Sequence, residues 1–162
     1  MLVAPCAHDE EDRLRALARY AVLDTSPEAD FDAVTQLLSF ICDTPITLVS
    51  LVDRDRQWFK SRQGLDAAET SRDLAFCAHA ILQSDPLIVE DVTRDPRFAD
   101  NPLVLSDPNI RFYAGAPLIT HDGFALGTLC AIDIKPRTFS PTQVHALTTL
   151  ARHVVALLEL RL

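Results

Sequence analysis

The sequence has few lysines and no cluster of basic residues. Lysine occurs only at Lys60 and Lys135, and 15 basic side chains stand against 23 acidic ones, which gives a formal net charge of −8. A chain with this charge balance repels the phosphate backbone of a polyanion. Nucleic acid is therefore not an expected partner.

Long apolar runs are also missing. No stretch approaches the roughly 20 apolar residues that span a bilayer. Residues 1–9 lack the basic and apolar regions of a secretory signal. We therefore expect no membrane association and a cytosolic location.

The four cysteines do not form the close pairs that zinc sites use, because Cys6, Cys42, Cys77 and Cys130 lie far apart. In a cytosolic chain we expect reduced and mostly buried thiols. The sequence has no Ser-His-Asp arrangement and no HExxH motif, and its four glycines are too dispersed to build a phosphate-binding loop. No metal, cofactor or catalytic residue is evident.

The length and composition predict one folded domain. The chain has 162 residues, of which 48% are hydrophobic and 23% charged, a mixture typical of globular domains rather than disordered chains. We expect residues 1–8 to be a flexible N-terminal tail. Residues 9–162 would then form the single domain.

Two helices are predicted near the N-terminus. Residues 9–21 are rich in charge, with apolar residues at helical spacing: Leu14, Leu17 and Ala18 or Ala21. The next helix is predicted to begin with Ser26 as N-cap and Pro27 at the first helical position. The residues expected on its apolar face are Phe31, Val34, Leu37, Leu38 and Ile41.

Strand patterns occupy the middle of the chain. We expect a hairpin from residues 46–52 and 56–62, a short strand at 87–89, and a second hairpin from 111–119 and 124–133. The second hairpin turns at Asp122-Gly123, a strong turn signal. Gly127 inside its last strand indicates a bulge or a close backbone approach.

The C-terminal segment, residues 141–162, is predicted to be a long helix. Ser140, Pro141 and Gln143 supply an N-cap, a proline at the first helical position and a capping-box partner. The apolar stripe of this helix is Leu147, Leu150, Val154 and Leu157, widened by Ala151 and Leu158. One face would cover the sheet. We also hypothesise that this helix mediates homodimerisation, paired with the first helix.

The segment "LAFCAHAIL", residues 74–82, places a thiol and an imidazole two positions apart. On a strand Cys77 and His79 would share one face, whereas on a helix they would point to nearly opposite sides. The alanines and the spacing of Leu74, Cys77 and Ile81 favour a helix capped by Ser71 or Asp73. Cys77 would then face the core, and Phe76 and His79 would share the side open to a pocket.

Five sequence stretches occur in an order that resembles a GAF domain, in particular the bacterial subgroup found beside sensor histidine kinases and diguanylate cyclases. They are "LDTSPEADFDAVTQLLSFICDTPITLVSLVDRDRQWFKSRQGL", "FCAHAIL", "DPRFADNPLV", "IRFYAGAPL" and "GTLCAID". The resemblance extends over about residues 12–160. It implies an α+β fold with a PAS-like central antiparallel sheet of five or six strands, terminal helices packed on one face and a ligand pocket on the other.

The resemblance also implies which segments form the pocket. The helix at residues 76–79 would be one wall, the loop at 95–104 the lid, and residues 113–115 with Thr128 the floor. The ligand-binding residues expected from this placement are Phe76, Cys77, His79, Asp95, Arg97, Phe98, Asn101, Tyr113, Ala114, Gly115 and Thr128.

Departures from other GAF subgroups narrow the implied ligand. The Asn-Lys…Phe…Asp-Glu signature of cyclic-nucleotide-binding members is missing, and Ala78 intervenes where phytochrome-like members have a histidine directly after the bilin-binding cysteine. Free-methionine-sulfoxide reductases use more than one cysteine around the lid, but this chain has none between Cys77 and Cys130. These departures argue against a cyclic nucleotide, a bilin and free methionine sulfoxide. The implied ligand is an unknown small molecule.

The leading hypothesis is a cytosolic sensory domain that binds a small molecule and passes a signal through its terminal helices to an output domain or a partner kinase or cyclase. It places the chain in two-component or cyclic-di-GMP signalling. One alternative is a thiol-based redox enzyme that uses Cys77, with Cys130 as resolving partner. Another is a dimerisation module whose pocket is filled by its own side chains.

Overall fold

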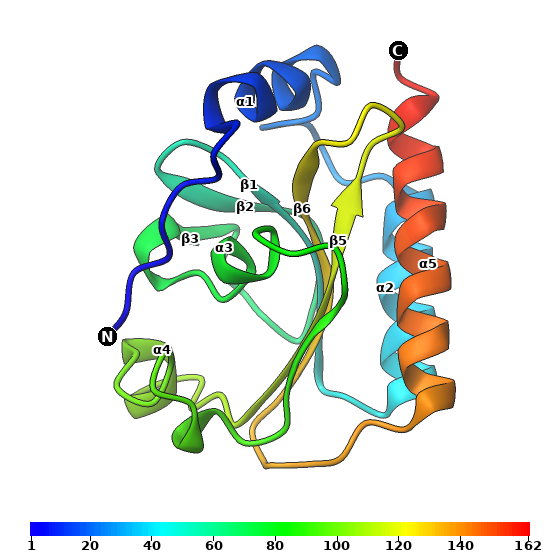
Figure 1. Ribbon diagram of the computed structural model, residues 1–162. Helices are drawn as coiled ribbons and strands as arrows, with labels where there is room; N and C mark the ends of the chain where they lie inside the picture. Colours follow the sequence, from blue (N-terminus) through cyan, green and yellow to red (C-terminus); the bar gives the residue numbers. More distant parts are fainter.

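The structure is a computed structural model that describes residues 1–162. A six-stranded antiparallel sheet forms the centre of the molecule (Figure 1). The strand order is β3-β2-β1-β6-β5-β4. In chain order the elements are α1 (Glu10–Arg19), α2 (Ala29–Cys42), β1 (Ile46–Val52), β2 (Arg56–Gln63), β3 (Glu69–Ser71), α3 (Cys77–Ala80), β4 (Leu87–Val89), α4 (Pro102–Leu105), β5 (Phe112–Ile119), β6 (Ala125–Asp133) and α5 (Pro141–Glu159), with short 3-10 turns at Arg72–Leu74 and Val92–Arg94. The predicted α+β class and six-stranded sheet are confirmed.

The sheet separates two apolar layers, because alternate side chains of a strand point to opposite faces. On β1, Val49 and Leu51 belong to a cluster of 22 buried residues on the side of the long helices. Ile46 and Leu48 belong to a cluster of 14 on the other side. Because this strand is buried on both faces, residues 46–52 form one continuous, mostly apolar run rather than an alternating pattern.

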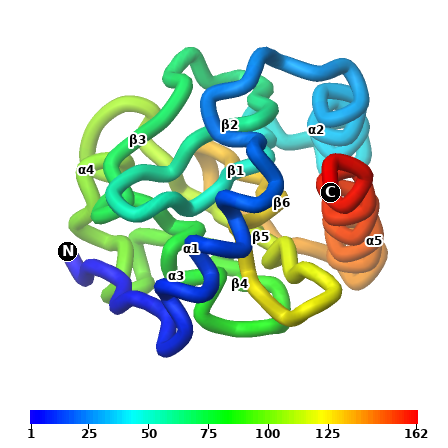
Figure 2. The backbone as a smooth tube through the Cα atoms, turned by 90° about the horizontal axis from the view of Figure 1, so that it is seen from above, coloured from blue at the N-terminus to red at the C-terminus, as the bar shows by residue number.

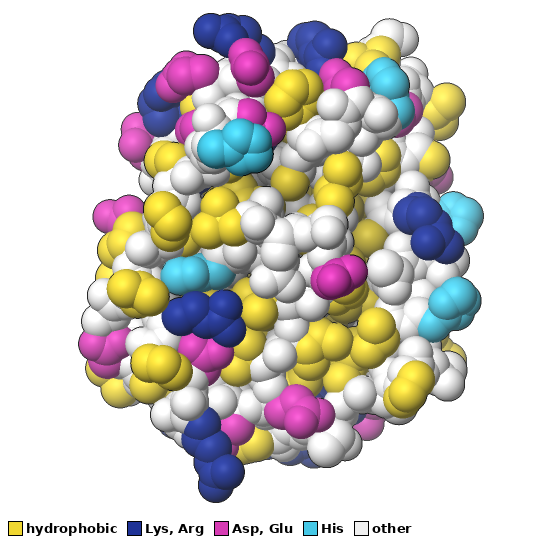
Figure 3. Space-filling model, viewed as in Figure 1, with side chains coloured by type: hydrophobic (Ala, Val, Ile, Leu, Met, Phe, Trp, Pro, Cys, Tyr) yellow, Lys and Arg dark blue, Asp and Glu magenta, His cyan; other side chains and the backbone are white.

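The long helices α2 and α5 lie side by side on one face of the sheet, and the short helices α3 and α4 lie on the other (Figures 1 and 2). The first helix, α1, lies across one end of the sheet. No helix of the structure has the length and apolarity that a membrane crossing requires. On the face drawn in Figure 3 the basic side chains are dispersed among acidic and neutral ones.

Several local sequence signals are confirmed. Ser140 and Gln143 form a capping box at the start of α5. The β5–β6 hairpin turns at Gly123, whose φ is +91°. Gly127 marks a close approach of β6 to β1, since a Cβ there would lie 1.9 Å from the Ser50 carbonyl oxygen.

The start of α2 differs from the prediction. The helix begins at Ala29, not after Ser26, because Lys60 binds the preceding segment in a non-helical conformation. Lys60 is buried, and its Nζ donates to Thr25 Oγ1 and to the Ser26 carbonyl, both at 2.7 Å. It also forms an ion pair with Glu28. This contact with β2 therefore overrides the local cap.

The apolar face predicted for α2 is partly wrong. Phe31, Val34 and Leu38 are buried as expected, but Leu37 and Ile41 are exposed. Thr35 takes an inward position instead and shares a hydrogen bond of 2.8 Å with Ser61 of β2. The two exposed side chains leave an apolar surface on the outside of the helix.

Smaller differences concern the other elements. The sequence pattern did not predict β3. On α1, Ala16 and Leu17 are buried, whereas Ala18 and Ala21 are exposed. On α5 the fully buried stripe is Leu147, Ala151, Val154 and Leu158, and Leu150 and Leu157 are only half-buried.

A buried ionic cluster ties α1 to the turn that precedes α3. Glu10 accepts hydrogen bonds from Arg13 at 2.8 Å and from Arg72 at 2.6 Å. Burial raises the pKa of the Glu10 carboxyl, but the hydrogen bonds from the two arginines outweigh burial and lower this pKa to about 2. The folded state therefore favours the ionised carboxyl.

We expect Glu10→Gln to lower the free energy of unfolding by about 2 kcal/mol at pH 7, with allowance for partial solvent exposure. Because the folded pKa is depressed, the stabilisation is complete above pH 4.5 and is lost as pH falls towards 2. Urea unfolding between pH 7 and pH 3 should show a flatter pH profile for the variant. The control Glu11→Gln removes an exposed pair with Arg54 and should leave stability nearly unchanged; equal losses in both variants would contradict this prediction.

Candidate functional site

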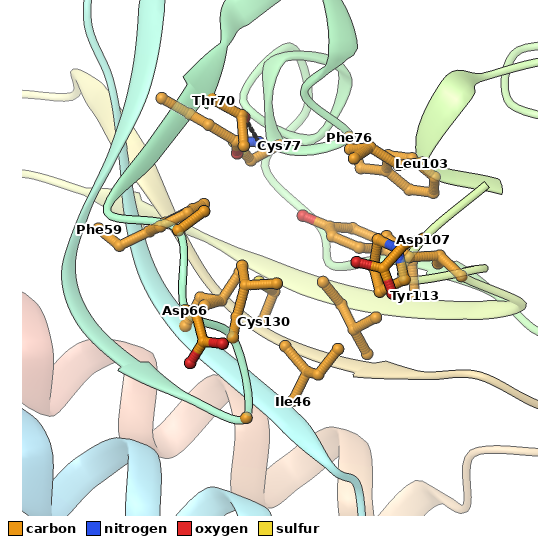
Figure 4. Close-up of a pocket in the computed structure, with 18 residues that line it drawn as sticks. Ile46, Phe59, Asp66, Thr70, Phe76, Cys77, Leu103, Asp107, Tyr113 and Cys130 are labelled. Carbon is orange, nitrogen blue, oxygen red and sulfur yellow. Dashed lines mark hydrogen bonds between the residues drawn. The ribbon is translucent and has the colours of Figure 1, made fainter.

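A cavity of about 370 Å³ lies on the sheet face opposite α2 and α5. Figure 4 shows side chains from the sheet facing those that come from α3, α4 and the connecting loops. Such a volume lies at the lower end of the range for small-molecule sites. The lining residues are mostly apolar: Ile46, Leu48, Gln57, Phe59, Gly64, Leu65, Asp66, Ala67, Thr70, Phe76, Cys77, Leu103, Asp107, Pro108, Ile110, Tyr113, Cys130 and Ile132.

A buried hydrogen-bond network forms one part of the cavity wall. The Cys77 thiol donates to Gln57 Oε1 at 2.8 Å, and the Ser50 hydroxyl donates to the same oxygen at 3.0 Å. The Gln57 amide in turn donates to Thr70 Oγ1. Because Cys77 acts as a donor, the network favours its protonated thiol.

The titratable groups in the interior wall are neutral at physiological pH. Burial raises the pKa of Cys77 to about 11, and burial also raises the pKa of Cys130. The Tyr113 hydroxyl is fully buried, which raises its pKa well above 10, and it shares a hydrogen bond of 3.4 Å with Thr128. None of these groups is prepared to act as a nucleophile.

Aromatic stacking positions the wall formed by α3 and the loop at 95–104. Phe76, at the start of α3, stacks on Phe98 with ring centroids 4.3 Å apart and an interplanar angle of 9°. Phe76 lines the cavity, and Phe98 lies behind it, buried. Tyr113 lies 5.3 Å from the Phe76 ring and continues the wall onto β5.

Asn101 ties the same loop to the segment before α3. Its Oδ1 accepts from the Leu103 backbone N–H and caps α4, and its Nδ2 donates to the Leu74 carbonyl at 3.1 Å. Asn101 therefore positions the wall and does not line the cavity. Of this loop only Leu103 lines the cavity, and Asp107, Pro108 and Ile110 of the following segment add to the lining.

The predicted helix at residues 74–82 is shorter than expected. Ser71 caps a 3-10 turn, Ala75 is extended, and α3 begins only at Cys77. Cys77 and His79 point apart, as a helix requires. The assignment of their sides needs correction, because Cys77 lines the cavity and His79 does not. Helical periodicity correctly placed Cys77 on the inward face of the helix, but it did not indicate that this face lines the cavity.

The remaining predicted residues lie outside the cavity lining. His79 Nε2 is 3.1 Å from the Leu2 carbonyl oxygen, so the imidazole contacts the N-terminal segment. Asp95 and Arg97 form an ion pair with each other at 2.7 Å. Ala114 faces the long helices. Gly115 leaves room for Tyr113, because a Cβ at position 115 would lie 2.3 Å from the Tyr113 hydroxyl oxygen.

Sequence reasoning missed Gln57 and Thr70, which form the polar part of the wall. Strand alternation in residues 56–62 places Gln57 and Phe59 on one face, and that signal could have identified Gln57 and Phe59 as lining residues. Thr70 lies on the unpredicted strand β3, opposite Gln57 in the register. No local pattern singles out Asp66 or Asp107.

The chain is thus an α+β domain with one six-stranded antiparallel sheet, long helices on one face and an apolar cavity on the other. The family model for the GAF domain matches residues 26–158 of the chain, and the chain belongs to this family. This match confirms the resemblance drawn from the sequence motifs.

The chain is similar to one longer protein in sequence and to solved structures in fold. The chain is 41% identical, over 157 residues, to a cyclic di-GMP phosphodiesterase of Pseudomonas aeruginosa; the alignment covers 96% of this chain and 27% of that protein. The GAF domain of an Acinetobacter phosphoenolpyruvate-protein phosphotransferase superimposes with a TM-score of 0.69 at 17% identity, over 94% of each chain. Free methionine-R-sulfoxide reductase of Neisseria meningitidis, solved with its substrate, gives a TM-score of 0.65 at 19% identity, over 98% of this chain and 95% of that one.

We expect only one of the four thiols to react rapidly in the folded protein. Cys6 is exposed, whereas burial raises the pKa of Cys42 and Cys77 to about 11 and raises that of Cys130 further. Titration with Ellman's reagent at pH 8 should show one fast equivalent, and the other three thiols should react roughly a hundredfold more slowly. Cys6→Ser should abolish the fast phase. A fast phase that remains in Cys6→Ser and disappears in Cys77→Ser would contradict the prediction.

Proposed function

We propose that this chain is a regulatory, non-enzymatic GAF domain that binds a small molecule in the cavity between the sheet and α3. The observation that carries the proposal is the cavity itself, about 370 Å³ with aromatic walls and a satisfied polar network. A mostly apolar pocket with a few positioned polar groups is the usual composition of a ligand site.

The contacts around the cavity support a relay to the terminal helices. Arg72, five residues before Cys77, binds Glu10 of α1. At the other end of α1, the Tyr20 hydroxyl donates to Glu159 of α5 at 3.2 Å. A ligand that moves the α3 wall would therefore bias the position of both terminal helices, which is the physical requirement for coupling between two sites.

The relative from Pseudomonas aeruginosa supports a signalling context. This chain spans 27% of that cyclic di-GMP phosphodiesterase, so the phosphodiesterase activity belongs to a protein much longer than the aligned region. We propose that the domain regulates an output domain or partner enzyme of cyclic-di-GMP signalling in the cytosol. A kinase of a two-component system is the corresponding alternative output.

We also propose a homodimer, formed by the outer surface of α2 and α5 rather than by α5 and the first helix, α1, as the sequence suggested. Three apolar residues of α2 are exposed, Leu37, Phe40 and Ile41, and Phe40 is 85% exposed. A shallow groove lined by both helices includes Leu150 and Leu157 of α5 and Leu160, which directly follows α5. A projecting ring and an apolar groove on one surface suit a two-fold interface, in which each copy offers the same patch.

The two alternatives from the sequence are less well supported. A thiol enzyme needs a reactive thiolate, but the Cys77 thiol donates to Gln57 and burial raises its pKa to about 11. The fold shared with a free methionine-R-sulfoxide reductase rests on 19% identity and carries no activity with it. A module filled by its own side chains conflicts with the volume of the cavity.

A metabolite screen tests the proposed function. We expect at least one compound to raise the melting temperature of the wild-type protein, because a ligand that binds only the folded state stabilises it. In Cys130→Phe the added ring would occupy the cavity, and the apparent affinity of the compound should fall at least tenfold. If Cys130→Phe does not fold, Ile132→Phe provides a second blocked variant from the same strand.

A blank screen, together with no ligand co-purifying in native mass spectrometry, would overturn the proposed function. Stabilisation of the same size in wild type and in a folded, blocked variant would show that the compound binds elsewhere. Both results bear on the cavity and not on the dimer.

The dimer has a separate test. We expect Phe40→Glu to raise the dimer dissociation constant at least tenfold in analytical ultracentrifugation, because it places a charge in the apolar contact. The control Leu105→Glu changes a side chain that is 67% exposed on α4 and should leave the dimer intact. Wild-type protein that stays monomeric at high micromolar concentration would contradict the prediction.

A further inference from the structure

The formal charges around the cavity are all negative. Among the residues that line it, only Asp66 and Asp107 have acidic or basic side chains that count towards the formal charge, and both are exposed, which places them at the mouth. They come from different segments, the β2–β3 connection and the loop after α4. Figure 4 shows both carboxylates among the lining side chains. The cavity therefore presents carboxylates to an entering molecule.

No basic side chain lines the cavity to balance these carboxylates. The two arginines closest in sequence to the loop's lining residues have other partners. Arg97 pairs with Asp95, and Arg111 Nη1 donates to the carbonyls of Val104 and Ile110 at 2.8 and 2.9 Å. An anionic ligand would therefore lose its hydration without gaining a counter-charge, which is costly in an apolar site.

The interior of the cavity suits the body of a small organic cation. Phe59 of β2, Phe76 at the N-cap of α3 and Tyr113 of β5 supply three aromatic side chains from three different parts of the fold. Aromatic faces attract cations, and they also bury apolar carbon atoms. A cavity of about 370 Å³ admits a compact molecule of this kind.

We propose, on the basis of the proposed function, that the ligand class of this cavity is a compact organic cation. It would be an ammonium group attached to an apolar or aromatic body. The body lies among the three aromatic side chains, and the ammonium group is held at the mouth by Asp66 and Asp107. The same arrangement disfavours carboxylates and phosphates.

A matched set of three probes tests this ligand class: 2-phenylethylamine, 2-phenylethanol and phenylacetate. They share a phenyl ring and differ in charge, being cationic, neutral and anionic at pH 7. Dissociation constants come from ligand-detected NMR or titration calorimetry at low salt. We expect the amine to bind at least tenfold more tightly than the alcohol, a difference of about 1.4 kcal/mol, and phenylacetate to bind more weakly than the alcohol. Raising the ionic strength should reduce the advantage of the amine.

The double variant Asp66→Asn/Asp107→Asn should bring the affinities of the amine and the alcohol to within about twofold of each other. The control Asp55→Asn/Asp85→Asn removes the same total charge from exposed positions away from the cavity and should keep the preference. A preference that disappears equally in both double variants would overturn the proposal, because net charge and not the mouth would then cause it.

Two further results would overturn the proposal without touching the proposed function. One is an alcohol or phenylacetate affinity equal to that of the amine in the wild-type protein. The other is no binding of any probe while the metabolite screen yields a ligand that Cys130→Phe excludes. A blank metabolite screen together with no co-purifying ligand remains the result that removes the proposed function itself.

Discussion

The constraint on which this structure depends is a sheet buried on both faces. Every residue of β1 is buried, so alternate side chains must satisfy two different layers. The same holds for most of β6, where Leu129 and Ala131 face the long helices and Cys130 and Ile132 face the cavity. Close pairing of these two central strands also requires Gly127, because any side chain there would collide with the β1 backbone.

The two faces differ in what covers them, and this difference creates the cavity. On one face α2 and α5, of 14 and 19 residues, pack continuously along the strands. On the other face α3 and α4 have four residues each, and loops connect them. Short elements cannot fill a sheet surface as a long helix does. The Phe76–Phe98 stack and the Asn101 hydrogen bonds join these short elements into one wall beside the cavity.

Ionic contacts join segments that are distant in sequence and connect the two layers. The cluster of Glu10 with Arg13 and Arg72 attaches α1 to the cavity wall. Glu28 pairs with both Lys60 of β2 and Arg161 at the end of α5. Because these charges are at least partly buried, they depend on their partners more than surface pairs do. The proposed relay between cavity and terminal helices would run through such contacts.

The sequence by itself determined the elements whose signals are local. The strands at 46–52 and 87–89, the turn at Asp122-Gly123 and the capping box at Ser140 follow from residue type and short-range periodicity, and the ordered motifs identified the GAF family. Only the tertiary structure decided the start of α2, where Lys60 of β2 binds Ser26 and Glu28. It also decided that Cys77 and not His79 faces the cavity, that Gln57 and Thr70 meet there, and that the charges at the mouth are Asp66 and Asp107. These features depend on contacts between distant segments and on space left unfilled, and a one-dimensional pattern encodes neither.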